Sequence, residues 1–146
     1  MEGFELSTVI NRPIEEVFGF LANLENDAKW RREWVEAKKT SEGPIGIGAR
    51  FRLVSEALSR RIETEYEVTK YEPNWIAAWK TVSGPLPLRF QRTFESVEGG
   101  TQVTIRYEAE IRGFFKLIKP LVVSAGKQAL QGDFPKLKEL MEARAL

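Results

Sequence analysis

The chain has 146 residues, and its 22 basic and 21 acidic side chains leave a net charge of +1. This length can form one domain with a real hydrophobic core, and the near-neutral charge gives no reason to expect a nucleic-acid partner. Cysteine and histidine are both absent, which excludes disulfides, thiol nucleophiles, Ser-His-Asp triads and histidine or thiolate metal sites. We therefore expect a single domain, residues 1–146, that works without a metal or another cofactor.

The sequence shows no segment suited to crossing or entering a membrane. No signal peptide is visible at the N-terminus, and no apolar run approaches about 18 residues. A cytoplasmic protein with no stable membrane insertion is the expectation. The sequence leaves the oligomeric state open.

The N-terminal part favours one strand and then a short helix. Apolar residues alternate with polar ones over residues 4–10, which predicts a strand. Residues 14–21 then have apolar side chains at helical spacing. Asn11 is suited to the N-cap of this helix and Pro13 to its first turn.

A second, polar helix is predicted over residues 27–34. In it Trp30 and Trp34 would lie four residues apart on one face, a spacing that suits core packing about as well as the rim of a cavity. This region also begins a run of basic side chains, which comprises Lys29, Arg31, Arg32, Lys38 and Lys39. We interpret the run as a solvated helix face in preference to a phosphate contact.

Beyond these helices the pattern changes to strands with one buried and one wet face. The segment 41–48, SEGPIGIG, has the glycine and proline content of a turn. Polar and apolar residues then alternate over several segments, which are 49–53, 62–69, 75–81, 88–95 and 102–111. Short turns link them, and Glu98, Gly99 and Gly100 indicate a tight hairpin. Consecutive strands joined in this way predict an antiparallel sheet.

The chain ends in a long predicted helix over residues 119–144. One face of it is apolar and consists of Val123, Leu130, Phe134, Leu137 and Met141. A neighbouring track with Leu121 and Ala125 is smaller and only partly apolar. Pro135 and Gly132 interrupt the middle of the helix. We expect the C-terminal half to seal the core and the N-terminal half to lie less tightly on the sheet.

These elements predict an α+β fold of the helix-grip type. A curved antiparallel sheet of six to seven strands would wrap around the long C-terminal helix, with two short helices after the first strand. The terminal helix is the only predicted element large enough to cover the dry face of the sheet.

Several segments resemble the START-like (SRPBCC) superfamily, in particular its polyketide cyclase/dehydrase and lipid-transport branch. They are NRPIEEVFGFLANLEN followed by Trp30, SEGPIGIGARFRLV, RRIETEYEVTKYEP, SGP, EGGTQVTIRYEAEIRG and the closing helix, which together span nearly the whole chain. The resemblance implies a deep, mostly apolar cavity between sheet and helix. Some relatives hold catalytic iron with histidines, and this chain, which has none, departs from that pattern.

Strand parity and the small helix track predict which side chains face this cavity. The candidate ligand-binding residues are Trp30, Phe51, Leu53, Tyr66, Trp75, Trp79, Phe90, Arg92, Tyr107, Leu121 and Ala125. The alternative is that these side chains meet the helix and fill the core. Apolar pockets with a few convergent polar groups are the usual form of a small-molecule site.

Arg92 is the sharpest candidate, because it falls between Phe90 and Phe94 on the apolar face of its strand. A buried guanidinium needs an acid, a tyrosine hydroxyl or a ligand anion beside it. We therefore consider that Arg92 fixes a carboxylate or enolate of an apolar ligand. A bulge that turns it to solvent, or an ion pair with a strand glutamate, is the competing interpretation.

Three functions fit these observations. The first is binding or transport of a hydrophobic small molecule such as a lipid, an aromatic or a polyketide-like compound. The second is a cyclase or dehydratase in which Tyr66, Tyr107 or Arg92 stabilises an enolate. It ranks lower, because no carboxylate falls on the inward track of a central strand. The third is a macromolecular interaction domain, which the near-neutral charge supports little.

Overall fold

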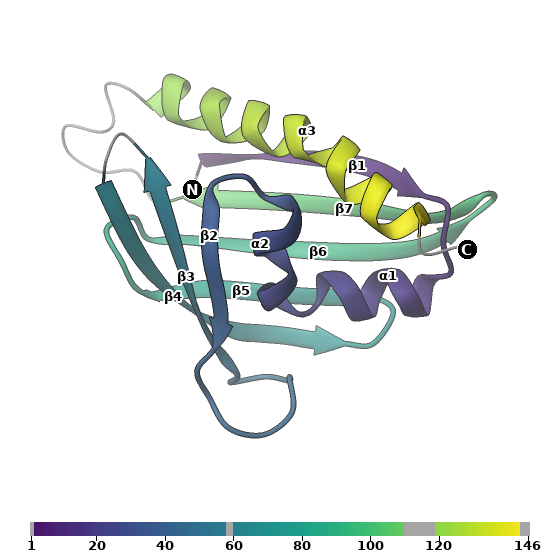
Figure 1. The fold of residues 1–146 in the computed structure, drawn as a ribbon, viewed down its shortest axis with the longest axis horizontal. Helices are drawn as coiled ribbons and strands as arrows, with labels where there is room; N and C mark the ends of the chain where they lie inside the picture. Colours follow the sequence, from purple (N-terminus) through teal and green to yellow (C-terminus); the bar gives the residue numbers. More distant parts are fainter. Residues whose placement is uncertain (1, 58–59, 110–118, 144–146) are drawn as a thin grey trace.

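The computed structural model describes residues 2–57, 60–109 and 119–143 (Figure 1). Within these residues the strands are β1 (Glu2–Ile10), β2 (Trp34–Lys39), β3 (Arg50–Ala57), β4 (Arg60–Glu72), β5 (Ile76–Ser83), β6 (Leu88–Val97) and β7 (Gly100–Ala109). The helices are α1 (Ile14–Leu21), the short 3-10 helix η1 (Leu24–Asn26), α2 (Asp27–Trp30) and α3 (Lys119–Ala143). None of these helices is both long and apolar enough to cross a bilayer.

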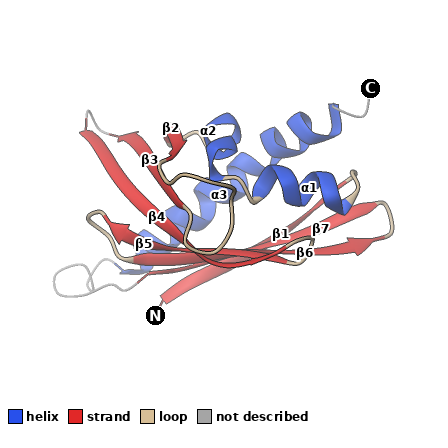
Figure 2. Ribbon diagram, turned by 90° about the horizontal axis from the view of Figure 1, so that it is seen from below, coloured by secondary structure: helices blue, strands red, loops and turns tan. Residues whose placement is uncertain are grey.

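The seven strands form one sheet in the order β1-β7-β6-β5-β4-β3-β2, and every neighbouring pair is antiparallel. The sheet curls, and α1, α2 and α3 lie on its inner side (Figure 2). This arrangement confirms the predicted α+β helix-grip fold. The last predicted strand appears as β7, and the residues predicted to extend it to position 111 lie outside the described ones.

The alternation of side chains along the strands decides what enters the core. On β4, Thr64, Tyr66 and Val68 are buried, and the glutamates between them are only partly so. The same alternation buries a second set of side chains on the central strands, which comprises Phe90, Arg92, Phe94, Val103 and Ile105. Burial of such side chains stabilises the fold by about 25 cal/mol for each Å² of apolar surface removed from water.

The two halves of α3 differ in how deeply they are buried. Leu130, Phe134, Leu137 and Met141 in its C-terminal half are buried in the core. In the N-terminal half Val123 is half-buried and Leu121 is 70% exposed. The prediction that the C-terminal half seals the core while the other half lies less tightly is thus confirmed.

The helix predicted over residues 27–34 is wrong beyond Trp30. The backbone of Arg31 is extended, with φ −91° and ψ 110°, and this ends α2. A turn closed by the Trp34 amide, which donates to the Arg31 carbonyl at 3.1 Å, then leads directly into β2. Trp34 pairs there with Ser55 of β3, so the two tryptophans do not share a helix face.

The basic run is likewise not a helix face. Lys38 and Lys39 lie on the edge strand β2, and Arg31 is buried. Sheet edges favour lysine, because its charge discourages pairing with another chain. The sequence period in this segment was too short to distinguish a strand from a helix, and the sheet contacts of β2 decide it.

Candidate functional site

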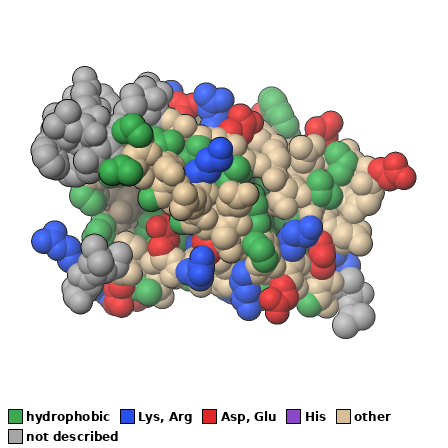
Figure 3. All heavy atoms as spheres, turned by 90° about the horizontal axis from the view of Figure 1, so that it is seen from above, with side chains coloured by type: hydrophobic (Ala, Val, Ile, Leu, Met, Phe, Trp, Pro, Cys, Tyr) green, Lys and Arg blue, Asp and Glu red, His purple; other side chains and the backbone are tan. Residues whose placement is uncertain are grey.

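A cavity of about 300 Å³ lies between the sheet and the less buried half of α3. Its apolar wall comes from strands, from the β5–β6 turn and from α3, and includes Phe4, Ile62, Tyr66, Leu86, Leu88, Val122 and Val123. Figure 3 shows a recess bordered by hydrophobic side chains at the end of the molecule where α3 begins. Ligand sites in proteins measure about 300–1,000 Å³, so this one suits a small ligand.

Stacked aromatic rings form one wall of the cavity. Tyr107 stacks between Phe4, with ring centres 5.3 Å apart, and Phe90, at 4.9 Å. Tyr66 meets Phe90 edge to face at 5.3 Å. These contacts follow from the register, which sets Tyr107 opposite Phe4 on β1 and opposite Phe90 on β6. The wall is therefore held by three neighbouring strands and is preformed.

Gly126 allows α3 to approach β1 closely. A Cβ atom at this position would lie 3.0 Å from the Cε1 atom of the Phe4 ring, which is tighter than ordinary van der Waals contact. Phe4, Gly126 and Val123 all line the cavity. The size of this residue therefore helps to set how far the helix stands off the sheet.

Arg31 supplies the polar end of the cavity from the turn after α2. Its Nε donates to Asp133 Oδ2 of α3, its Nη1 to the Tyr107 hydroxyl and its Nη2 to Glu33 Oε1, each at 3.0 Å. The side chain is only 4% exposed. Asp133 Oδ1 also accepts a hydrogen bond from Arg32 at 3.0 Å. Arg31 thus ties the middle of α3 to the cavity wall.

The surroundings change the acidity of these groups. Desolvation alone would lower the pKa of Arg31, but attraction from Tyr107, Glu33, Asp27 and Asp133 outweighs it and raises this pKa overall. Desolvation raises the pKa of Glu33, and Arg31 offsets part of that rise. Burial likewise raises the pKa of the Tyr66 hydroxyl. Arg31 therefore stays charged and Tyr66 stays protonated.

Tyr66 brings a hydroxyl to the same cavity. Its ring is buried, and among the described residues the hydroxyl has no hydrogen-bond partner. A hydroxyl can both donate and accept a hydrogen bond, so this group can bond to a molecule in the cavity.

Arg92 is buried in the core and pairs with an acid that the sequence did not indicate. Its Nη1 and Nη2 donate to Asp27 Oδ1 at 2.9 Å and Oδ2 at 2.6 Å, and Nη1 also donates to the Leu21 carbonyl at 2.9 Å. The guanidinium lies over the rings of Trp30, Trp79 and Phe90 at 5.4–5.6 Å. The expected need for an acid is met by Asp27, and Arg92 does not line the cavity.

The candidate residues from the sequence divide into three groups. Tyr66 and Tyr107 line the cavity, and their role in binding a ligand stays a prediction. Others are buried in the core and do not line the cavity themselves, and these are Trp30, Phe51, Leu53, Trp79, Arg92 and Phe90, whose ring supports the lining residue Tyr107 from behind. For them, core packing was the better of the two interpretations.

Trp75, Leu121 and Ala125 are exposed, and their predicted inward orientation is wrong. Trp75 is 57% exposed, because it lies in the turn before β5, next to Asn74 with φ 63°, and not within the strand. Leu121 and Ala125 point away from the sheet, and Val122, Val123 and Gly126 line the cavity instead. The small helix track was assigned to the wrong side.

The cavity residues that sequence reasoning missed are mainly polar. Arg31 and Glu33 lie in the turn that was predicted as helix, so no parity argument applied to them. Asp133 does not line the cavity but holds Arg31, and it did carry a signal, because it falls three residues after Leu130 and one before Phe134 on the apolar face of α3. A carboxylate in such a place indicates a buried partner of opposite charge.

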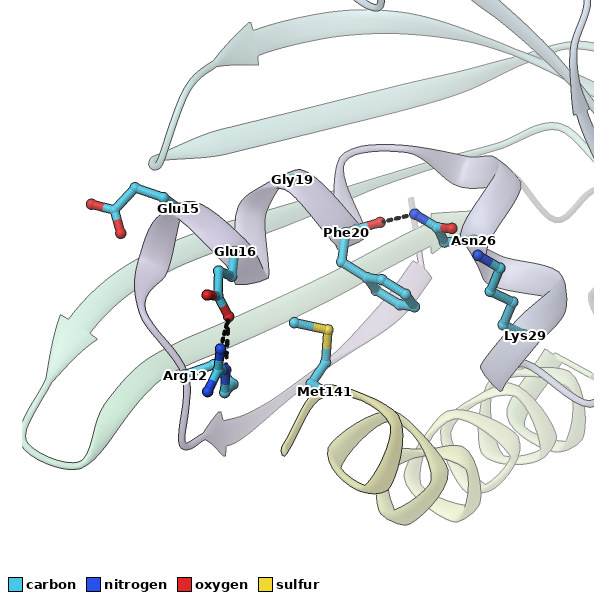
Figure 4. Close-up of a pocket in the computed structure, with 8 residues that line it drawn as sticks. All are labelled: Arg12, Glu15, Glu16, Gly19, Phe20, Asn26, Lys29 and Met141. Atoms are coloured by element: carbon cyan, nitrogen blue, oxygen red, sulfur yellow. Dashed lines mark hydrogen bonds and ion pairs between the residues drawn. The ribbon is translucent and has the colours of Figure 1, made fainter. Parts of the chain in front are cut away.

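A second, larger depression has a different character. It measures about 510 Å³ and lies between α1, α2 and the end of α3. Figure 4 shows that its lining is largely polar, with Arg12 paired to Glu16 and the Asn26 amide donating to the Phe20 carbonyl. Only Phe20 and Met141 give it apolar surface beside Gly19. It does not suit a hydrophobic ligand.

Residues 1–142 match the family described as polyketide cyclase / dehydrase and lipid transport. Similar solved structures include a protein from Thermus thermophilus, with 18% identity and a TM-score of 0.79, covering 97% of this chain and 98% of that one. A START superfamily protein from Mycobacterium smegmatis has 13% identity and a TM-score of 0.78, covering 96% and 97%. The Zhui aromatase/cyclase from a Streptomyces species has 12% identity and a TM-score of 0.78, covering 98% and 94%.

At these identities the structural likeness shows the shared fold alone. No curated protein matches the chain.

Proposed function

Because this chain belongs to the polyketide cyclase / dehydrase and lipid transport family, we propose that it binds a small hydrophobic molecule in the cavity between its sheet and α3. The observation that carries the proposal is the preformed apolar space beneath the first half of the helix. Its wall joins aliphatic residues of α3 to stacked aromatic rings of the sheet, and a polar cluster closes one end.

The polar cluster would orient the ligand. Arg31 has N–H groups left over beyond its three hydrogen bonds, and the Tyr66 hydroxyl has no described partner. Both groups line the cavity together with Tyr107. A ligand with an apolar body would pack against the aromatic rings, and one polar atom at its end would bond to the polar cluster.

Thermal unfolding with three naphthyl compounds tests the proposal. The compounds share one ring system and differ in the end group, and they are 2-acetylnaphthalene, 2-naphthoate and 2-naphthylmethylammonium. At least one should stabilise the protein in a saturable manner, since a ligand at 100 times its dissociation constant adds about 2.7 kcal/mol. Failure of all three, together with no organic molecule in native mass spectra of the purified protein, would count against a binding function.

A pair of α3 variants locates the binding. Val123→Phe adds a ring inside the cavity, whereas Leu121→Phe adds the same ring on the exposed side of the helix. We expect Val123→Phe to abolish the ligand-induced stabilisation and Leu121→Phe to retain it. Equal responses of the two variants would place the binding elsewhere.

A cyclase or dehydratase activity is a second candidate, and one observation favours it. Glu33 lines the cavity beside Arg31, and desolvation raises its pKa toward the range of a general base. Arg31 and the tyrosine hydroxyls could then stabilise an enolate oxygen. Turnover of a poly-β-ketone that is lost in Glu33→Gln, with ligand binding retained, would establish this activity. Binding without turnover leaves the carrier function.

A further inference from the structure

The charged groups of the cavity wall are already matched within the protein. Among the described residues, the charged residues that line the cavity are Arg31, Glu33 and Glu108. Arg31 pairs with both Glu33 and Asp133 at 3.0 Å. Asp133 also pairs with Arg32 at 3.0 Å, so the two arginines are balanced by the two carboxylates together, and Glu33 is needed for the match.

Glu108 is matched in the same way from the outer side of the sheet. It accepts hydrogen bonds from Arg89 at 2.9 Å and from Arg106 at 2.8 Å. These bonds lower its pKa, so the carboxylate stays ionised and paired. No charge on the described cavity wall is left over for a ligand ion of either sign.

The hydrogen-bonding groups that remain available in the cavity wall carry no unbalanced charge. The Tyr66 hydroxyl has no partner among the described residues, and Arg31 keeps N–H groups that can donate without losing its two carboxylates. An ionic ligand would lose its hydration on entering the cavity and would meet no free counter-charge there. Both effects make its binding in an apolar space unfavourable. A carbonyl or hydroxyl oxygen loses much less hydration free energy and can accept hydrogen bonds both from the Tyr66 hydroxyl and from the Arg31 N–H groups.

We propose that the cavity selects uncharged ligands, namely aromatic or alicyclic ketones and alcohols, over carboxylates and amines, and that Glu33 is the residue that excludes anions. This inference rests on the proposed binding function and names its ligand class. It replaces the anion anchor expected at Arg92, because the cavity arginine is Arg31 and its charge is already matched.

Isothermal titration calorimetry with the same three naphthyl compounds tests the inference. We expect the dissociation constant for 2-acetylnaphthalene to be at least about tenfold lower than those for 2-naphthoate and 2-naphthylmethylammonium. The reason is that each of the two ions would lose its water in the cavity without gaining a free counter-charge. Naphthoate or the ammonium compound binding as tightly as the ketone overturns the inference and leaves the binding function intact. Absence of binding by all three, together with no organic molecule in native mass spectra of the purified protein, counts against both the inference and the binding function itself.

Glu33→Gln and Glu36→Gln form a matched pair for the role of Glu33. The two side chains are 47% and 48% exposed, but Glu36 pairs with Arg61 and does not line the cavity. Glu33→Gln should raise the affinity for naphthoate about fivefold by freeing part of the Arg31 charge, and Glu36→Gln should leave it unchanged. An unchanged naphthoate affinity in Glu33→Gln, or an equal gain in Glu36→Gln, overturns the assignment.

Discussion

Replacing Asp27 with alanine should destabilise the protein strongly, because it leaves the guanidinium of Arg92 buried without a counter-charge. Arg92 has no exposed surface, and Asp27 receives both of its terminal nitrogens at 2.9 and 2.6 Å. Breaking a buried pair by removing one partner costs about 3–5 kcal/mol. This is a large part of the roughly 5–15 kcal/mol by which domains of this kind are stable.

Urea unfolding followed by tryptophan fluorescence measures the effect. At an m-value of about 2 kcal/mol/M, a loss of about 4 kcal/mol lowers the urea midpoint by about 2 M. The control is Glu63→Ala, which breaks an exposed pair with Arg52 at 2.8 Å and should cost at most about 1 kcal/mol. A cost for Asp27→Ala as small as that of the control would refute the reasoning.

The double variant Asp27→Leu with Arg92→Met separates the loss of the charge pair from the loss of packing. An apolar replacement of a whole buried pair is often neutral, since neither charge is left desolvated. We therefore expect the double variant to be more stable than Asp27→Ala alone. If the losses in unfolding free energy of Asp27→Leu and Arg92→Met simply add in the double variant, the unpaired charge is not the cause of the destabilisation in Asp27→Ala.

Two further outcomes follow from single residues. Desolvation raises the folded-state pKa of Glu33 above its ordinary value of 4.5, so its contribution to stability is full below that pH and is lost as the pH rises through the folded value. Glu33→Gln should therefore match the wild type in melting temperature near pH 4 and exceed it at pH 7; a difference that does not change with pH would contradict this. Gly100→Ala should cost about 2–4 kcal/mol, because φ is 142° and an added Cβ would lie 2.1 Å from the Ile10 carbonyl oxygen. Gly99→Ala, with φ 88° and nothing within 4 Å, should cost less in the same urea assay, and equal costs would show that the contact with Ile10 does not matter.

Local patterns were sufficient to predict the fold. Period-two alternation placed Phe51, Leu53, Tyr66 and Phe90 on the inner face, and helical spacing identified the buried positions Leu130, Phe134 and Leu137. These patterns can be read locally, because each element buries one face and apolar residues therefore recur along it with the period of the element. The exceptions lie at element ends, where Trp34 begins a strand and Trp75 ends a turn, because a short segment takes its conformation from its neighbours in space.

The polar part of the site could not be predicted in the same way. Arg31 and Asp133 are 102 residues apart in the chain, and Asp27 and Arg92 are 65 apart. Nothing in the spacing of either residue identifies its partner. The sequence indicated that Arg92 needed an acid, but only the packing of α2 against the sheet shows which acid meets that need.

Because the two halves of α3 pack differently against the sheet, the residues that build the core and the residues that line the cavity are different. The half from Leu130 to Met141 is buried in the core, whereas Val122, Val123 and Gly126 line the cavity. Substitutions upstream of Leu130 can therefore reshape what the protein accommodates at little cost to its folding. Under the binding function proposed above, changes in the first turns of α3 would alter which ligands fit while the core keeps its packing.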